Sequence, residues 1–416
     1  MKEKNTTTES ASTVCYERIE AHARQRIQKW LQDMLEAEVT EFLGRAKSER
    51  RTQCEEPLAG YRNGYGKPRR VAFTAGTIAV RRPRMRNLAE RFESRVLPMF
   101  KRRTKELGAM LPELYLHGLS SGDFELALRG LLGEGAPLSA ASLLRLKGTW
   151  QAEYESWKRA DLSKLELVYW WADGLYVKAG LSDRKAALLV IVGASASGQK
   201  VLLACQAGER ESKESWLSVL RDLKARGLKF PRLTVADGHL GIWAALGELH
   251  PAGDEQRCWN HKIVNVLDAL PKKEQPEAAE RLSAMMYAES RSACERKRDE
   301  FLLRFKKTDP KACATLTRDW ERLVTLFDYP QEHWVHLRTT NIVESPFNAV
   351  RLRTDASRRF KKTENAEAMI WKLLLVAEKS WRALNAPHLM GDVYDGKLFK
   401  DGIAVRTTIE PTRKAA

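Results

Sequence analysis

Three acidic residues of this chain can act together if the fold brings them close: Asp173, Asp237 and Glu344. Asp173 stands within the apolar and aromatic run LELVYWWADGLYVK, residues 165–178, which is typical of a buried strand. A carboxylate there is costly to bury unless it is paired or holds a metal ion. The alternative is that Asp173 caps a turn before Gly174.

Asp237 ends a second short apolar run, RLTVADG, and Glu344 lies in a helical pattern further along the chain. When two carboxylates approach each other, the pKa of at least one of them rises, unless divalent cations neutralise their charge. Mg²⁺ and Mn²⁺ prefer such oxygen ligands. A third acid from a helix on the sheet would complete a site for two ions about 3.5–4 Å apart.

The spacing around Glu344 predicts a helix with one polar and one apolar face. The polar face holds Glu344, Asn348 and Arg351. The apolar face holds Val343, Phe347 and Val350. The polar face would direct an acid and an arginine at one ligand, as a metal-bound phosphodiester requires. Taken alone, Glu344 also fits a solvated helix acid.

Cys258 and His261 form a Cys-x-x-His pair. Such a pair can be half of a zinc site, but no second pair stands at suitable spacing. The favoured interpretation is that Cys258 packs as a small buried group. His261 then begins a helix near the acids, where it hydrogen-bonds a phosphate or Asp237.

The elements that would position these residues alternate in a recognisable order. Runs at 165–173, 185–194 and 200–208 predict three antiparallel strands. A helix at 215–228, a strand ending on Asp237, a helix at 241–250 and a strand at 255–259 follow. This order predicts an RNase H-like α/β fold, a mixed five-stranded sheet whose first and fourth strands are neighbours.

The domain boundaries follow from changes in composition. We expect the RNase H-like catalytic core at 160–270, an all-α insertion at 271–329 and the C-terminal helices of the core at 330–387. Residues 1–16 and 388–416 read as tails. Residues 106–155, with turns at 118–124 and 133–142, resemble a helix-turn-helix DNA-binding domain.

Residues 17–105 predict a DNA-binding or dimerisation region made of a helix and a basic β-ribbon. The helix, 17–43, has apolar residues at three- and four-residue steps and ends at Gly44; it either packs on its own domain or forms a dimer. Residues 60–105 carry fourteen basic residues against two acidic ones, a surface suited to phosphates. The candidate phosphate-binding residues are Arg62, Arg69, Arg70, Arg81, Arg82 and Arg84.

The composition of the 416 residues restricts the class of protein. A net charge of +17 favours a polyanionic partner, nucleic acid first and an anionic membrane surface second. The six cysteines include no Cys-x-x-Cys pair, which favours reduced thiols over a disulfide framework. No run is long and apolar enough to cross a membrane, and no signal peptide is evident. We expect a cytoplasmic, nucleoid-associated protein.

Several motifs together resemble one family, the Mutator-type bacterial insertion-sequence transposases. The matching segments, spanning about residues 20–385, are TEFLGR, YRNGY, ADGLYVK, ESWLSVLRDLKARGL, VADGHLG, QRCWNHKIVNVLDALPKK and EHWVHLRTTNIVES. The resemblance implies an RNase H-like Asp-Asp-Glu enzyme whose triad is Asp173, Asp237 and Glu344, with Cys258 and His261 as a supporting signature. The chain departs from the family at Ile342 and at Ser345-Pro346. Because Pro346 removes a backbone hydrogen bond, the helix of Glu344 should start late or kink.

The resemblance also implies a function. A transposase of this kind would bind the terminal inverted repeats of its element and cut and rejoin double-stranded DNA with two Mg²⁺ or Mn²⁺ ions. It would act as a homodimer or larger assembly, by a route that favours a circular intermediate. Arg338, Arg351 and Arg353 are candidates for holding DNA phosphates near the metal ions. The alternatives are a transposase-derived, non-catalytic DNA-binding regulator and an RNase H-like nuclease or resolvase.

Overall fold

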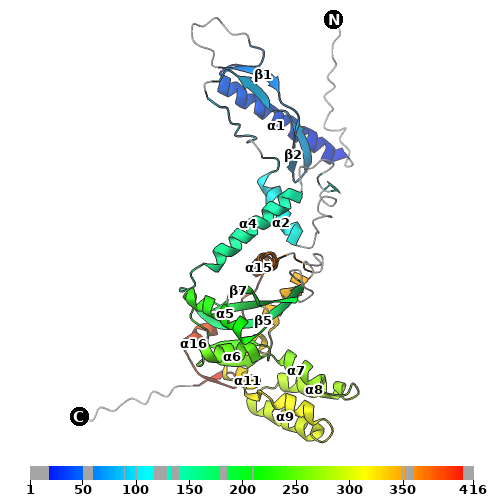
Figure 1. Cartoon of the computed structure of the whole chain (residues 1–416), viewed down its shortest axis with the longest axis vertical. Coiled ribbons are helices and arrows are strands. Elements are labelled where there is room, and N and C mark those ends of the chain that lie inside the picture. Colours follow the sequence, from blue (N-terminus) through cyan, green and yellow to red (C-terminus); the bar gives the residue numbers. More distant parts are fainter. Residues whose placement is uncertain are drawn as a thin grey trace, which may run out of the picture. The chain divides into compact units, whose positions relative to one another are not determined.

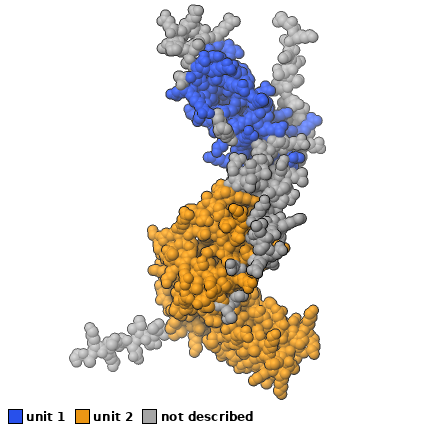
Figure 2. Space-filling model, in the orientation of Figure 1, with its two compact units in different colours: residues 1–146 blue, residues 147–416 orange. Residues whose placement is uncertain are grey.

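The computed structural model divides the chain into two compact units, residues 1–146 and 147–416 (Figure 2). The residues that it describes are 18–49, 60–88, 90–98, 101–116, 129–130, 132, 140–178, 185–208, 210–238, 240–348, 350–351, 354, 360 and 362–405. The expected tail at 1–16 lies outside them. No helix among the described residues combines the length and apolarity that a membrane crossing requires.

The first unit is a helix packed against two antiparallel ribbons (Figure 1). The helix α1 (Ile19–Leu43) ends at Gly44, whose left-handed φ of 62° closes it, as predicted. The strands β2 (Arg69–Phe73) and β3 (Gly76–Val80) form the predicted β-ribbon. The strands β1 (Tyr61–Tyr65) and β4 (Pro83–Arg86) form a second, unpredicted ribbon.

The helix α1 has two apolar faces, and only one of them packs on the β2–β3 ribbon. Leu31 and Leu35 are buried with Val71, Ile78 and Val80 of the ribbon in one apolar cluster. The other apolar stripe of the helix, which includes Ile19 and Trp30, is largely exposed to solvent. A single helix can bury only the face that its own sheet covers, so α1 has a second apolar face left over.

The structure describes only part of the predicted helix-turn-helix domain. The structure describes the helices α2 (Lys105–Leu116) and α4 (Ala140–Lys158). The turn at 118–124 and most of the turn at 133–142 lie outside the described residues. Tyr154, which we expected in this domain, belongs to the second unit: it is buried and donates a hydrogen bond of 2.6 Å to the Cys205 carbonyl.

The second unit is built on a five-stranded mixed sheet in the order β7-β6-β5-β8-β9. Its strands are β5 (Leu167–Lys178), β6 (Lys185–Ser195), β7 (Lys200–Gly208), β8 (Leu233–Ala236) and β9 (Asp254–Arg257). The first three pair antiparallel, whereas β5, β8 and β9 run parallel. The helices α5 (Lys213–Ala225) and α6 (Leu240–Leu249) supply the crossovers. The fold is RNase H-like, as predicted.

The alternation of side chains along β5 builds both faces of this sheet. Trp170 and Ala172 face the core that α5 and α6 cover. Tyr169 and Trp171 are tied to the C-terminal segment: the Tyr169 hydroxyl lies 2.8 Å from His333 Nδ1, and Trp171 Nε1 donates to the His336 carbonyl. Both faces are therefore dry, which explains why the run before Asp173 is continuously apolar.

Residues 271–329, where we expect the insertion, fold as helices and turns. After α7 (Trp259–Leu267) come α8 (Gln275–Met286), α9 (Arg291–Phe305), α10 (Pro310–Thr317), α11 (Trp320–Val324) and the 3₁₀ turn η3 (Thr325–Asp328). A buried lysine of α7 fastens them to the core. Lys262 is fully buried, and its Nζ donates hydrogen bonds of 2.6 and 2.5 Å to the carbonyls of Thr315 and Arg318.

The C-terminal part of the chain extends the core further than predicted. The short helices η4 (Gln331–His333), α12 (Trp334–Leu337) and α13 (Asn341–Glu344) lead to α15 (Thr363–Glu378), which packs beside β7. The expectation of a tail from 388 onward is wrong for its described part. There η5 (Pro387–Leu389), α16 (Met390–Tyr394) and the hairpin β10 (Phe399–Lys400)–β11 (Ile403–Ala404) follow, because Met390, Val393 and Phe399 are buried.

Replacing Lys262 with Met should destabilise the protein by about 1–3 kcal/mol, because two buried carbonyls lose their donor. Burial, followed by the charge of Arg257, lowers the pKa of Lys262 from 10.5 to about 7. Between these values the unfolded chain holds a proton that the folded chain lacks, so this residue's contribution to stability rises with pH. Urea unfolding below and above that window should show the rise in the wild type and not in Lys262→Met.

The matched control is Lys272→Met, because Lys272 is exposed. This variant should keep both the midpoint and the pH dependence of the wild type. Equal pH dependence in Lys262→Met and in the wild type would contradict the assignment.

Candidate functional site

Asp173 and Asp237 lie side by side where the parallel pairing of β5 and β8 ends. The last pair in register is Ala172 with Ala236, and the two aspartates are the next residues of their strands. The expectation that Asp173 closes its strand is wrong. The strand continues to Lys178, paired with β6 alone, and Asp173 stands opposite Val190. Asp173 is therefore held by a continuous strand rather than by a turn.

Glu344 comes to the same region on α13, which lies against β5 and β6. The predicted continuous helix is interrupted as Pro346 required: α13 ends at Glu344, and a helical hydrogen bond resumes only from Val350 N–H to the Pro346 carbonyl, at 3.3 Å. The predicted apolar face is nevertheless confirmed, because Val343, Phe347 and Val350 are fully buried.

His261 lies between two of the three acids. Its Nδ1 is 3.8 Å from Oδ1 of Asp237 and 3.9 Å from Oε1 of Glu344. It stands in the first turn of α7, directly after β9, the strand next to that of Asp237. About a third of the side chain is exposed, as for both acids, so the group is open to a ligand from one side.

Cys258 supports this group from within the core. It is fully buried at the start of α7 and accepts a hydrogen bond of 3.4 Å from the Thr340 backbone N–H. The Thr340 hydroxyl lies 3.2 Å from the Cys258 sulfur and donates to Glu344 Oε1. Thr340 thereby connects the Cys-x-x-His pair to the third acid. Its place one helical turn before Glu344 was a signal that the sequence offered and that we did not use.

The electrostatics of the group reflect crowded negative charge. Burial, followed by the charge of Glu344, raises the pKa of Asp173 to about 7, although the Gly174 N–H and His261 oppose the shift. A hydrogen bond with Cys258 and the charges of Asp237 and Glu344 raise the pKa of His261 to about 10. A protonated His261 therefore compensates part of the charge that a divalent cation would otherwise have to balance.

The donor set of the three acids fits Mg²⁺ or Mn²⁺, because it consists of hard carboxylate oxygens. Among the described residues, one group of three side chains that could bind a metal ion has all its ligand atoms within 4.8 Å of one another: Cys258, His261 and Glu344. Those three alone do not complete the four-ligand site that structural zinc adopts. The Cys258 sulfur is also engaged by Thr340. An oxygen-ligated cation held by the three acids therefore stays a prediction.

A fourth acid, Glu211, was not predicted. It is buried in the turn before α5, its carboxylate lies so close over Gly174 that a side chain there would clash, and its charge also raises the pKa of Asp173. A hydrogen bond joins it to Tyr176. No sequence pattern marks this residue, because its approach to Asp173 is made only by the packing of the turn onto β5.

Arg257 fixes the backbone next to Asp237. Its side chain is buried, forms an ion pair of 2.9 Å with Asp319 of the insertion, and passes closely over Gly238. The Gly238 N–H in turn donates to the Asp237 carboxylate. The insertion therefore reaches the candidate site through one buried arginine.

The six candidate arginines of the first unit divide into two groups. Arg62 donates to the Thr40 hydroxyl, at 2.7 Å, and Arg69 donates to the carbonyls of Pro98 and Lys101, so both stabilise the unit itself. Arg82 is half-buried. The exposed members are Arg70, Arg81 and Arg84.

The three candidate arginines of the second unit differ in the same way. Arg338 donates to the Met286 carbonyl, at 2.9 Å, and lies over the rings of Tyr287 and Trp334. Arg351 is exposed. Arg353 lies outside the described residues.

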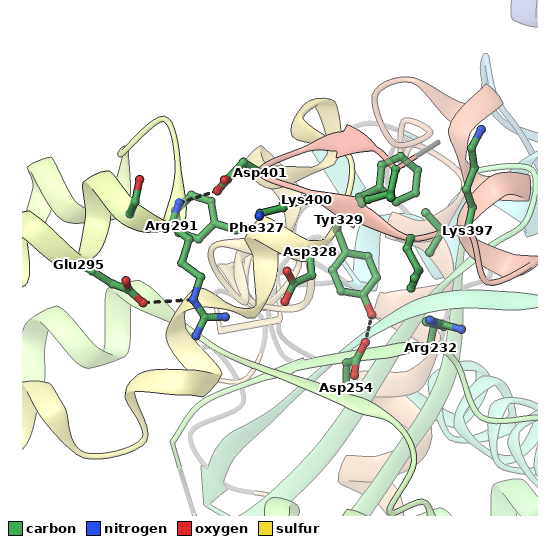
Figure 3. A pocket seen from close by; sticks show the side chains of 15 residues that line it. Arg232, Asp254, Arg291, Glu295, Phe327, Asp328, Tyr329, Lys397, Lys400 and Asp401 are labelled. Carbon is green, nitrogen blue, oxygen red and sulfur yellow. Dashed lines mark hydrogen bonds and ion pairs between the residues drawn. The ribbon is translucent and has the colours of Figure 1, made fainter. Parts of the chain in front are cut away.

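A separate hollow of about 670 Å³ lies between η3, α9 and the C-terminal hairpin (Figure 3). Three contacts join residues of its lining: the Tyr329 hydroxyl donates to Asp254, Arg291 pairs with Glu295, and the Arg291 backbone N–H donates to Asp401. It contains none of the predicted site residues. These contacts account for the docking of the hairpin, so we assign the hollow no chemistry.

Comparisons with known proteins identify relatives of the chain. Residues 1–383 match the model of the Mutator family of transposases. The transposase of the insertion element IS6120 of Mycolicibacterium smegmatis is 45% identical over 296 residues, 71% of this chain and 92% of its own length. The transposase of ISRM5 of Rhizobium meliloti is 30% identical over 380 residues, 90% of this chain and 92% of its own length.

One solved structure is a distant match, the Drosophila P element transposase strand transfer complex. It covers 73% of this chain and 84% of its own, at 11% identity and a TM-score of 0.30. At these values it contributes nothing to the assignment of the fold or of the site.

Replacing Gly238 with Ala should destabilise the protein by about 1–3 kcal/mol, because the new methyl group would overlap the Arg257 guanidinium, which the Asp319 ion pair holds in place. The control is Gly247→Ala within α6, where nothing lies near the added methyl; it should gain roughly 0.5–1 kcal/mol. Urea unfolding measures both. Equal stability of the two variants would show that Arg257 does not hold this backbone.

Proposed function

The chain belongs to the Mutator family of transposases, and on that premise we propose that it cuts and joins the ends of an insertion element with Asp173, Asp237 and Glu344 as ligands of two divalent metal ions. The observation that carries the proposal is the convergence of these acids. Asp173 and Asp237 follow the last paired residues of two parallel strands, and His261 links Asp237 to Glu344. The three come from β5, the end of β8 and α13, far apart in the sequence.

The metal ions would activate a water molecule and neutralise the charge that develops on the phosphodiester. The water oxygen bonds to phosphorus, the bond from phosphorus to the 3′-oxygen breaks, and that oxygen leaves with a proton as a 3′-hydroxyl. In the same site this 3′-oxygen would then bond to the phosphorus of a phosphodiester in another strand and give up its proton. The bond from that phosphorus to its own 3′-oxygen would break, and that oxygen would leave with a proton as a new 3′-hydroxyl. The triad acts as ligands throughout, so no covalent bond between protein and DNA forms.

The remaining residues of the site position the triad. Thr340 fixes the carboxylate of Glu344, and Cys258 fixes Thr340. His261 offsets the mutual repulsion of Asp237 and Glu344 before a metal ion arrives. Glu211 adds a fourth carboxylate, itself buried, beside Asp173 and so strengthens the local attraction for cations.

The first unit would recognise the terminal inverted repeats. Residues 60–105 hold fourteen basic residues and two acidic ones, a net charge of +12 out of +17 for the whole chain. Arg70, Arg81 and Arg84 are exposed and therefore available to phosphates. Because transposition brings two DNA ends together, we expect at least two copies of the chain on the DNA.

Asp173→Asn should lower cleavage of a labelled element end in Mg²⁺ by roughly 1,000-fold or more, because one of the proposed metal ligands loses its charge. Binding of the uncut end should change little. The variant should fold at least as stably as the wild type, since it removes a buried charge that Glu344 opposes. Mn²⁺ should raise the unfolding temperature of the wild type more than that of the variant.

The control for this test is Asp395→Asn, an exposed acid outside the site. It should cut at the wild-type rate. Wild-type cleavage by Asp173→Asn would disprove the triad. A wild type that binds the repeats but cuts in no divalent metal would instead be the non-catalytic regulator.

The double substitution Arg81→Ala/Arg84→Ala should weaken binding of the element end at least about tenfold at low salt. The slope of log affinity against log salt should fall by about 2, one unit for each lost phosphate contact. Fluorescence anisotropy over a salt series measures both quantities. Cleavage at saturating DNA should remain, because these residues lie in a different unit from the triad.

The control has the same change in net charge: Lys306→Ala/Lys307→Ala on the exposed surface of the insertion. It should leave the affinity near that of the wild type. Equal loss in both double variants would mean that net charge, and not the β-ribbon, accounts for binding.

A further inference from the structure

The helix α1 carries an apolar stripe, around Trp30, that stays exposed among the described residues of its unit. Leu31 and Leu35 are buried against the ribbon, but Trp30 is 61% and Ile19 53% exposed. A tryptophan is costly to leave in water, and an apolar stripe opposite the packed face of a helix marks an interaction surface.

The exposed stripe is symmetric about Trp30. Ala23 precedes Trp30 by seven residues and Ala37 follows it by seven, so all three lie on one line along the helix; both alanines are exposed. Trp30 also lies one residue from the midpoint of the 25-residue helix. A pattern that reads alike in both directions is what a two-fold interface between identical surfaces uses.

The charges of α1 also suit an antiparallel pair, because its first half is mainly basic and its second half is acidic. Before Trp30 the helix has three basic residues and one acidic one; after it, four acidic residues and no basic one. The residues before Trp30 are Glu20, Arg24, Arg26 and Lys29, and those after it are Asp33, Glu36, Glu38 and Glu41. Two such helices attract each other when antiparallel and repel when parallel. Beside the stripe, the exposed Arg26 would meet the Asp33 of a second copy.

We propose that α1 pairs antiparallel with the α1 of a second copy of this chain, with the two Trp30 side chains packed across a two-fold axis. Ala23 of each copy then faces Ala37 of the other, where small side chains let the helices approach. Arg26 and Asp33, which form no ion pair within the described part of the chain, complete each other between copies. DNA is a poorer occupant, because four acids line the second half of the helix.

The first test is the oligomeric state of the full chain without DNA, by light scattering coupled to size exclusion. The wild type should be a dimer. Trp30→Glu should raise the dimer dissociation constant roughly 30-fold or more, the effect typical of a buried aromatic anchor. Gln25→Glu, which adds the same charge at an exposed position of α1 off the stripe, should remain a dimer. A monomeric wild type, or an unchanged Trp30→Glu dimer, overturns the proposal.

The second test fixes the orientation of the helices by disulfide cross-linking. Cys15 and Cys54 are first replaced with Ser; the four cysteines among the described residues are buried. A mixture of Ala23→Cys and Ala37→Cys proteins should cross-link under mild oxidation, and neither protein alone should do so. Cross-linking of Ala23→Cys with itself would indicate a parallel pair and overturn the proposed geometry.

The third test is a charge exchange. Arg26→Asp and Asp33→Arg should each weaken the dimer, and the double variant should restore it, because the pair is re-formed with reversed sign. A double variant weaker than both singles contradicts the proposal. The pairing rests on the proposed function only because two DNA ends need two copies of the chain. If the protein is a monomer, metal-dependent nicking of single ends can still occur. If the triad is not catalytic, the dimer can still form.

Discussion

The second unit has to hold Asp173 at the end of an apolar sheet, with the carboxylates of Asp237 and Glu344 nearby, and both burial and negative charge oppose its ionisation. Asp173 shows the cost directly, because burial and Glu344 raise its pKa to about 7. The chain answers with groups that offset negative charge. His261 lies between Asp237 and Glu344, the Gly174 N–H favours the ionised form of Asp173, and the Thr340 hydroxyl binds Glu344. What remains of the charge is what a divalent cation would neutralise.

Much of the surrounding structure can be understood as support for this arrangement. The sheet is dry on both faces, so β5 can hold an acid at a fixed place without water loosening the strand. The insertion is tied to the same region by two buried cations, Arg257 through Asp319 and Lys262 through two carbonyls. Each cation is expensive to bury, and each has the partners that burial requires.

The first unit differs from the second, because its notable features are exposed basic residues and an exposed apolar stripe rather than a buried site. Its core is small and holds α1 against one ribbon. The basic residues that are not used within the unit are exposed on the ribbons, and the second apolar face of α1 is exposed as well. The phosphate surface and the pairing of α1 that we propose both belong to this unit.

The sequence by itself determined the strand order of the sheet, the helix ending at Gly44 and the break at Pro346, because periodicity and turn residues are local. The β1–β4 ribbon and the elements after residue 388 were not predicted. The sequence also predicted the three acids and His261 as site residues, and that role stays a prediction. The tertiary structure decided what depends on register and packing. Asp173 stands in mid-strand because β6 keeps pairing beyond the end of β8. Glu211 and Arg257 reach the site only through contacts between distant segments, and which face of α1 is buried depends on the ribbon that covers it.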